Sequence, residues 1–338
     1  MQSARQLRTA VATSLVTLLI ASAAAFAADA PPADQKPLPV ALVDVLNKLS
    51  GGPHPGFRAN HAKGVLVTGT FTPAKTAPSL SKAPHFAASA PIPVLVRFSD
   101  TTGVPTIPDA SPDASPHGMA IRFKLPDGSS TDIVSISANG FPVGTPEDFL
   151  ALLTAISQSG PGVAKPTPVD QFVGSHPATL KFVTTPRPAP ESFATLAFYG
   201  VNAFKFTNAK GVSRYARYQI LPVAGEHALA APEAAKANPN YLMDELPKRL
   251  AAGPVKYRLL AQMAKDGDTT NDATAVWPPD RQLIELGVIT LTATEKDQVQ
   301  KTLLYNPLLL PSGIEASADP ILLARPPAYA VSFSRRQQ

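Results

Sequence analysis

Residues 118–137 read GMAIRFKLPDGSSTDIVSIS, and their pattern favours a β fold over a helical one. Apolar and polar side chains alternate in the first seven and the last seven residues, and turn-forming residues separate the two runs. Alternation with a period of two places successive side chains on opposite faces of a strand. The stretch therefore predicts two strands joined by a turn.

Alternating runs also occur on both sides of this stretch, at 65–71, 93–99, 258–264 and 281–294. Two further runs flank Asn208-Ala209-Lys210-Gly211, whose glycine suits a hairpin turn. Helices are predicted at 145–157, 240–253 and 294–304. About eight strands separated by turns suit an antiparallel β-barrel or a curved sheet within an α+β fold. We expect a single domain over residues 28–338.

The first 27 residues have the pattern of an export signal. Arg5 and Arg8 precede an apolar run at 10–20, and Ala-Phe-Ala at 25–27 suits cleavage. The apolar run is too short to span a membrane. Residues 1–27 are therefore predicted to be a cleaved signal peptide, and the mature protein is expected in the periplasm, with no membrane association after cleavage.

Composition excludes several classes of partner and chemistry. The chain has no cysteine, which excludes disulfides and thiolate ligands. Its net charge of +5 falls to about +3 without Arg5 and Arg8, too little to indicate a nucleic-acid partner. No G-x-S-x-G or phosphate-binding glycine loop is present, and the six histidines form no i,i+3 or i,i+4 pair. Serine-hydrolase, nucleotide and zinc chemistry thus have little support.

Two constellations remain, and the first lies near the start of the predicted domain. In FRANHAKG, at 57–64, Arg58 precedes His61 by three residues. The next strand, PVLVRFS, places Arg97 and Ser99 on one face and apolar residues on the other. Polar groups on a buried strand need partners, so these residues indicate an anion or acid–base site. A structural role for His61 is the alternative.

The second constellation is DPILLARPPAYAVSFSRR, at 319–336. Arg325 and Tyr329 are four residues apart and would share one face of a helix. Tyrosine is an occasional haem ligand, and a neighbouring guanidinium favours the phenolate form. Because Pro326 disfavours helical geometry at the residue before it, Arg325 is expected to cap the helix. A surface helix with a basic end is the alternative.

Taken together and in this order, the motifs resemble those of the haem catalase family. The resemblance extends from about Arg58 to Arg336, and it implies an α+β fold in which helices surround an antiparallel eight-stranded β-barrel. The matching stretches are RANHAKG (58–64), PVLVRFS (93–99), HGMAIRF (117–123), TDIV (131–134), FYGVNAFKFTNAKG (198–211), NPNYLMDEL (238–246), VWPPDRQLIELGVITL (276–291) and LPSGIEASADPILLARPPAY (310–329).

The resemblance implies a role for each residue of the two constellations. Tyr329 would be the axial ligand of the iron of haem b, with Arg325 keeping it as phenolate. His61 would be the catalytic acid–base, with Ser99 hydrogen-bonded to its far ring nitrogen. The haem-binding residues would be Arg58, Arg97 and Arg336 at the propionates, together with Phe141, for which core packing is an equal alternative.

Three departures from the family pattern bear on the activity. Ile136 stands where disproportionating catalases carry an asparagine, and Asn139 would point to the other face. Asn202 stands where many members carry a histidine. The chain stops nine residues after Tyr329, so the family's C-terminal helical region and NADPH site are expected to be absent.

These departures favour a small exported catalase-related peroxidase, a monomer or homodimer, with weak or no catalase activity. It would reduce hydrogen peroxide or organic hydroperoxides with a small-molecule reductant and so protect against oxidative stress. The alternatives are a true minimal catalase, a hydroperoxide isomerase of the allene-oxide type, and a haem-binding protein without turnover.

Overall fold

The computed structural model describes residues 36–338, and the predicted signal peptide lies outside them. Residues 37–338 form one compact unit. The strands are β1 Gly64–Pro73, β2 Ile92–Ser99, β3 Gly118–Lys124, β4 Ser130–Ile136, β5 Phe198–Tyr199, β6 Phe204–Thr207, β7 Ser213–Pro222, β8 Val255–Met263, β9 Leu283–Thr294 and β10 Ile314–Ala316.

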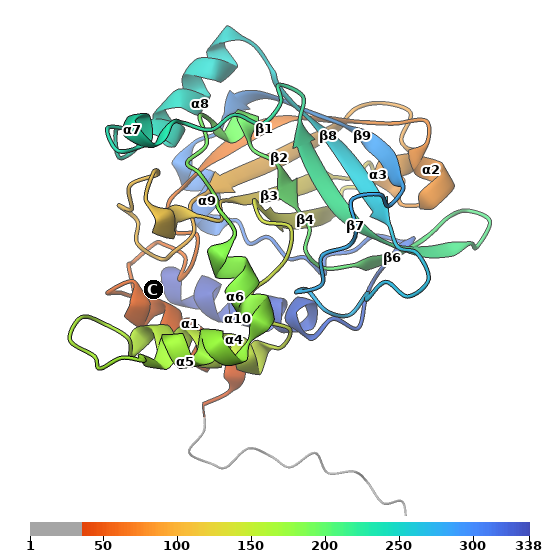
Figure 1. Cartoon of the computed structure of the whole chain (residues 1–338). Coiled ribbons are helices and arrows are strands. Elements are labelled where there is room, and N and C mark those ends of the chain that lie inside the picture. The colour runs from red at the N-terminus through yellow and green to blue at the C-terminus, as the bar shows by residue number, and fades with distance from the viewer. Residues whose placement is uncertain (1–35) are drawn as a thin grey trace, which may run out of the picture. The chain divides into compact units, whose positions relative to one another are not determined.

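Eight of these strands close into an antiparallel barrel (Figure 1). Their order is β7-β5-β4-β3-β2-β1-β9-β8, and β8 pairs back onto β7 to complete the ring. Strands β6 and β10 extend the sheet beyond β7. The predicted eight-stranded antiparallel barrel is therefore confirmed.

The alternation seen in the sequence fills the barrel. In β2, Val94, Val96 and Phe98 point into the main hydrophobic core. The pairing register of β9 shifts at two separate places, opposite β1 between Leu291 and Ala293 and opposite β8 between Glu285 and Gly287. Gly287 lies at the shift opposite β8 with φ 153°, and a Cβ there would come within 2.3 Å of the Thr72 carbonyl oxygen. Glycine at a bulge thus lets the sheet curve and close.

The helices are less regular than the strands. They are α1 Leu38–Leu49, α2 Ala77–Leu80, α3 Pro84–Ala87, α4 Pro146–Ser157, α5 Pro168–Ser175, α6 Pro177–Thr184, α7 Ala231–Ala234, α8 Tyr241–Ala252, α9 Asp297–Thr302 and α10 Pro320–Arg336. The predictions at α4 and α8 are confirmed, and α9 is shorter than expected. Helices α1, α5 and α6 were not predicted. Within residues 36–338, no helix is long and apolar enough to cross a membrane.

Helix α10 corrects one expectation. Arg325 lies inside the helix and does not cap it. The cap is Asp319, whose carboxylate accepts hydrogen bonds from the backbone N–H groups of Ile321 and Leu322. Pro326 and Pro327 are accommodated in the helix interior, at the loss of two backbone donors. Packing of α10 against α1 and α4 overrides the local preference of the prolines.

Candidate active site

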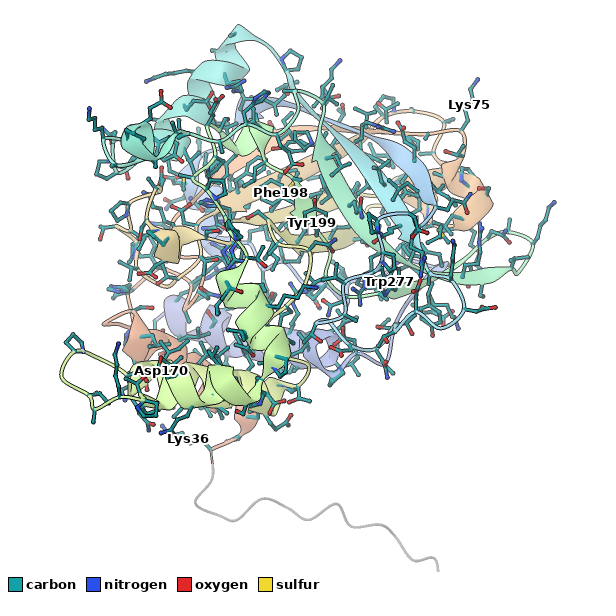
Figure 2. The ribbon with its side chains drawn as sticks, viewed as in Figure 1. Lys36, Lys75, Asp170, Phe198, Tyr199 and Trp277 are labelled. Carbon is teal, nitrogen blue, oxygen red and sulfur yellow. The ribbon has the colours of Figure 1, made fainter. Side chains whose placement is uncertain are left out.

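A large cavity lies between one wall of the barrel and helices α1, α4 and α10. Its volume is about 1450 Å³, including the mouth that opens to solvent. Strands β2 to β5 form the barrel side, and Figure 2 labels Phe198 and Tyr199 there. Phe198 is buried in the barrel core, whereas Tyr199 lines the cavity. All eight residues singled out in the sequence line it: Arg58, His61, Arg97, Ser99, Phe141, Arg325, Tyr329 and Arg336.

On the barrel wall that faces the cavity, one row of residues pairs across the neighbouring strands. Ser99 pairs with Gly64 on one side and with Gly118 on the other, and the row continues through Ile136 to Tyr199. A Cβ on Gly118 would lie 2.7 Å from Ser99 Oγ and 3.0 Å from the His61 ring. Glycine at this position therefore leaves the space that the imidazole occupies.

His61 is held in an unusual backbone conformation beside this wall. Its φ is 57°, in the left-handed region that non-glycine residues seldom adopt. Asn60 stabilises this turn, because its Oδ1 accepts hydrogen bonds from the backbone N–H groups of His61 and Thr102. The Nδ1 atom of the imidazole is 3.1 Å from Ser99 Oγ, the hydrogen bond expected from the sequence.

The surroundings keep this imidazole neutral. The pKa of His61 falls from 6.5 to about 3, first because of burial and then because of nearby positive charge, chiefly on Arg97 and Arg325. Because Nδ1 is engaged by Ser99, Nε2 is the nitrogen left to accept a proton. The site thus contains a neutral base whose orientation is set by a hydrogen bond and a constrained backbone.

Helix α10 presents a phenol supported by a guanidinium. Arg325 Nε donates to Tyr329 Oη at 3.0 Å, and Arg325 Nη1 donates to Asn202 Oδ1 at 2.9 Å. Asn202 in turn donates to Asp319, the residue that caps the helix, at 2.8 Å. The chain from Asp319 through Asn202 to Arg325 fixes the guanidinium against the phenolic oxygen. Asn202, which departs from the family pattern, is thus part of the site.

Three more arginines gather at the far end of α10 and the start of β1. Arg97 is 3% exposed and donates to Gln300 Oε1 and the Ala62 carbonyl oxygen. Arg336 is 6% exposed; its Nη2 donates to the Leu303 carbonyl oxygen, and its Nε has no partner among the described residues. Arg58 also donates to Leu303.

Within residues 36–338, none of these three guanidiniums forms an ion pair with a carboxylate. Burial, followed by repulsion from Arg97 and Arg336, lowers the pKa of Arg58 from 12.5 to about 7. Burial also lowers the pKa of Arg97 and of Arg336 to about 10. Buried positive charges without counter-charges are unfavourable unless an anion binds. The cluster therefore fits a ligand that carries more than one carboxylate.

The remainder of the lining is mostly apolar. Ile136 lines the cavity, whereas Asn139 is absent from the lining. Asn139 lies beyond the end of β4, so the expected alternation of faces along a strand does not apply to it. Phe141 also lines it and packs against Phe149, at 5.1 Å between ring centroids, so its two expected roles are compatible. Lining residues that sequence reasoning missed come mainly from α1 and from the segments beside the arginines: Leu42, Val43, Leu46, Asn60, Phe149, Tyr199, Tyr305 and Phe333.

A signal for some of these residues was available. Phe333 follows Tyr329 by four residues on the same helical face, so the spacing that links Arg325 to Tyr329 would also have found it. The lining residues of α1 carry no such signal, because nothing local marks where that helix packs.

The match to known proteins extends over most of the chain. A family model described as Catalase matches residues 55–337. The catalase-related peroxidase of Mycolicibacterium paratuberculosis is 38% identical over 292 residues, which cover 85% of this chain and 91% of the relative. The catalase-related peroxidase of Synechococcus elongatus is 34% identical over 301 residues, covering 86% and 87%.

The fold also matches a solved structure. A fungal catalase determined by crystallography superposes with a TM-score of 0.74 at 23% sequence identity. The superposition covers 87% of this chain and 62% of the fungal chain. At this identity, the likeness is one of fold.

Proposed function

The chain belongs to the catalase family, whose members generally bind haem and act on peroxide, and on that premise we propose that it is a haem peroxidase. Its substrates would be hydrogen peroxide or organic hydroperoxides, and its electrons would come from an external small-molecule donor. The observation that carries the proposal is the cluster of Arg58, Arg97 and Arg336, which has no ion-paired carboxylate within residues 36–338, in a cavity that also contains His61 and the Arg325–Tyr329 pair.

The residues present fit haem b. Arg58, Arg97 and Arg336 would bind its two propionates through charge-assisted hydrogen bonds. Tyr329 would hold the haem iron through its phenolic oxygen, and Arg325, whose Nε donates to that oxygen at 3.0 Å, would support it as an anionic ligand. When bound, haem would supply the redox chemistry needed to cleave an oxygen–oxygen bond with electrons from an external donor.

His61 would transfer the proton of the substrate. The low pKa of His61 keeps the imidazole neutral at physiological pH, so it can take a proton from the near oxygen of a hydroperoxide. The same nitrogen would then return that proton to the far oxygen, which leaves as water or an alcohol. Ser99 would hold Nδ1 throughout, so that Nε2 carries the proton in both steps.

The apolar lining favours the peroxidase reaction over disproportionation. Ile136 cannot hydrogen-bond a second hydrogen peroxide, whereas an amide there could orient it. The alkyl part of an organic hydroperoxide could pack against Ile136, Phe141 and the α1 side chains that line the cavity. We therefore propose weak or no catalase activity, electron donation without NADPH, and protection against oxidative stress in the periplasm.

Steady-state assays of the haem-loaded enzyme test this function. Hydrogen peroxide alone, hydrogen peroxide with a phenolic donor, and an alkyl hydroperoxide with the same donor would be compared by oxygen evolution and by donor oxidation. We expect donor oxidation with both peroxides and little oxygen. Rapid oxygen release from hydrogen peroxide alone would indicate a minimal catalase instead. Haem binding without turnover in any assay would also refute the proposal.

A further inference from the structure

A second cluster of ionisable side chains lies behind His61, outside the cavity lining. It consists of Lys63, Asp100, Asp109 and His117, whose exposed fractions range from 0 to 8%. Lys63 follows His61 by two residues, and Asp100 follows Ser99 directly. The cluster is therefore joined through the backbone to both members of the His61–Ser99 pair, although the proposed reaction does not use it.

Asp109 is surrounded by donors. It forms a short ion pair with Lys63, and its Oδ2 accepts a hydrogen bond from the backbone N–H of Leu242 at 2.7 Å, in the first turn of α8. Lys63 also donates to the carbonyl oxygens of Ile107 and Pro239, at 2.7 and 2.8 Å. A carboxylate beside an ammonium group and a helix N-terminus is stabilised as the anion.

Asp100 has fewer donors. Its Oδ1 is 2.9 Å from His117 Nδ1, but its Oδ2 is fully buried and has no donor among the described residues. Lys63 Nζ is 4.0 Å from that oxygen, too far for a hydrogen bond. The carboxyl groups of Asp100 and Asp109 nevertheless contact each other as a hydrogen-bonded pair. Two carboxylates can form such a bond only if one of them carries a proton.

We propose that Asp100 and Asp109 share one proton, and that release of this proton strengthens His61 as a base in the proposed peroxidase reaction. A proton held between the two carboxyl groups gives the orphaned oxygen of Asp100 a partner and leaves one negative charge beside Lys63. Loss of the proton to solvent adds one negative charge behind His61. That charge opposes the positive field that holds the imidazole neutral.

The other groups that face the pair set the pH at which it titrates. Burial raises the pKa of each carboxyl from 3.8 to about 6, and the hydrogen bond between them raises the pKa of Asp109 and lowers that of Asp100. Lys63 opposes the rise at both carboxyls, and Arg97 opposes it at Asp100. The Tyr241 hydroxyl on α8 also lies within electrostatic range of both acids. His117 stays neutral, because burial lowers its pKa to about 4.

The pair lies next to two residues beside the His61 ring. Asp100 directly follows Ser99, whose Oγ is 3.1 Å from His61 Nδ1, and it is hydrogen-bonded to His117, which directly precedes Gly118 at the ring. The negative charge of the ionised pair opposes the nearby positive charge, chiefly on Arg97, that lowers the pKa of His61. His61 itself titrates far below pH 6, so it cannot produce an acid limb near that pH. An acid limb near pH 6 would instead report the Asp100–Asp109 pair.

The first test concerns the shared proton and needs no activity. Difference infrared spectroscopy of the apoprotein between pH 4.5 and pH 8 should show a protonated carboxylic acid that disappears with a midpoint near pH 6. Asp100→Asn should abolish this signal. Asp127→Asn, which alters a carboxylate on an exposed turn, should leave it unchanged. If the wild-type protein shows no carboxylic acid titrating above pH 5, the shared proton does not exist.

The second test is the pH profile of kcat/KM for peroxide reduction, which rests on the proposed function. We expect the wild type to lose activity roughly three- to tenfold on the acid side of pH 6, the effect of one nearby charge on a general base. Asp100→Asn should be flat over that range, at the wild-type acid level. An unchanged midpoint in this variant would overturn the coupling to His61. Absence of turnover in the wild type would refute the function alone, since the infrared result is independent of it.

Discussion

Replacing Arg336 by methionine should move the stability of the apoprotein and its affinity for haem in opposite directions. Burial lowers the pKa of Arg336 from 12.5 to about 10, and each pK unit corresponds to about 1.4 kcal/mol. The buried charge therefore costs the folded apoprotein about 3 kcal/mol. The variant also loses the hydrogen bond to the Leu303 carbonyl oxygen, about 1 kcal/mol. We expect a net stabilisation of about 2 kcal/mol.

Haem affinity should fall in the same variant. A hydrogen bond to a charged group contributes about 1.5–3 kcal/mol, so the dissociation constant for haem should rise by roughly 10- to 150-fold. Urea unfolding of the apoprotein and haem titration followed by absorbance measure the two quantities. Arg335→Met is the matched control, because Arg335 is outside the cavity lining and pairs with Asp44 at 2.7 Å.

The two measurements together decide whether the arginine cluster is an anion site. Arg335→Met should leave haem affinity within about twofold, since a partly exposed ion pair contributes little. An Arg336→Met apoprotein that is less stable than wild type, with unchanged haem affinity, would show that the cluster is structural. The reasoning from uncompensated charge would then be wrong.

Three further changes have expected outcomes. Ile136→Asn should increase oxygen evolution from hydrogen peroxide alone several-fold, whereas Ile136→Leu should not; equal rates in the two variants would show that the amide has no role. Gly118→Ala should lower peroxidase kcat about tenfold or more, because its Cβ would displace Ser99 Oγ and the His61 ring, while urea unfolding should change little; full activity would contradict this. His85 packs among aromatic rings with an unpaired Nδ1, and burial lowers its pKa from 6.5 to about 3. The stability that neutral His85 contributes is complete above pH 6.5 and is lost as the pH falls toward 3, by about 3 kcal/mol at pH 4.5. In urea unfolding at several pH values, His85→Leu should reduce this loss of unfolding free energy with falling pH. An unchanged dependence of the unfolding free energy on pH would refute the assignment.

Much of the barrel could be predicted because strands carry their own signal. In β2 the alternation of apolar and polar residues assigned Val96 and Phe98 to the core and Arg97 and Ser99 to the opposite face, where the structure places them. The number of strands left a closed barrel or a curved sheet open, and pairing of β8 with β7 closes the ring. The contact between Arg325 and Tyr329 was predicted from spacing alone, since residues four apart share a helical face.

The features that escaped prediction depend on contacts between distant segments. The bond from Asn202 to Asp319 joins residues 117 positions apart, and the pair of Lys63 with Asp109 joins residues 46 apart. No local pattern marks either contact. At Arg325 the local signal led to a wrong prediction. Pro326 disfavours helical geometry at the residue before it, but tertiary packing keeps the helix continuous through Arg325.

The most direct test of a haem site is titration of the apoprotein with haem, followed by absorbance, in the wild type and in Tyr329→Phe. Tyr305→Phe is the control, because Tyr305 lines the same cavity and donates to the Leu95 carbonyl oxygen instead. We expect one haem per chain, an altered Soret band in Tyr329→Phe, and a wild-type band in Tyr305→Phe. A wild-type band in Tyr329→Phe, or no haem bound by the unmodified chain, would contradict the proposed site.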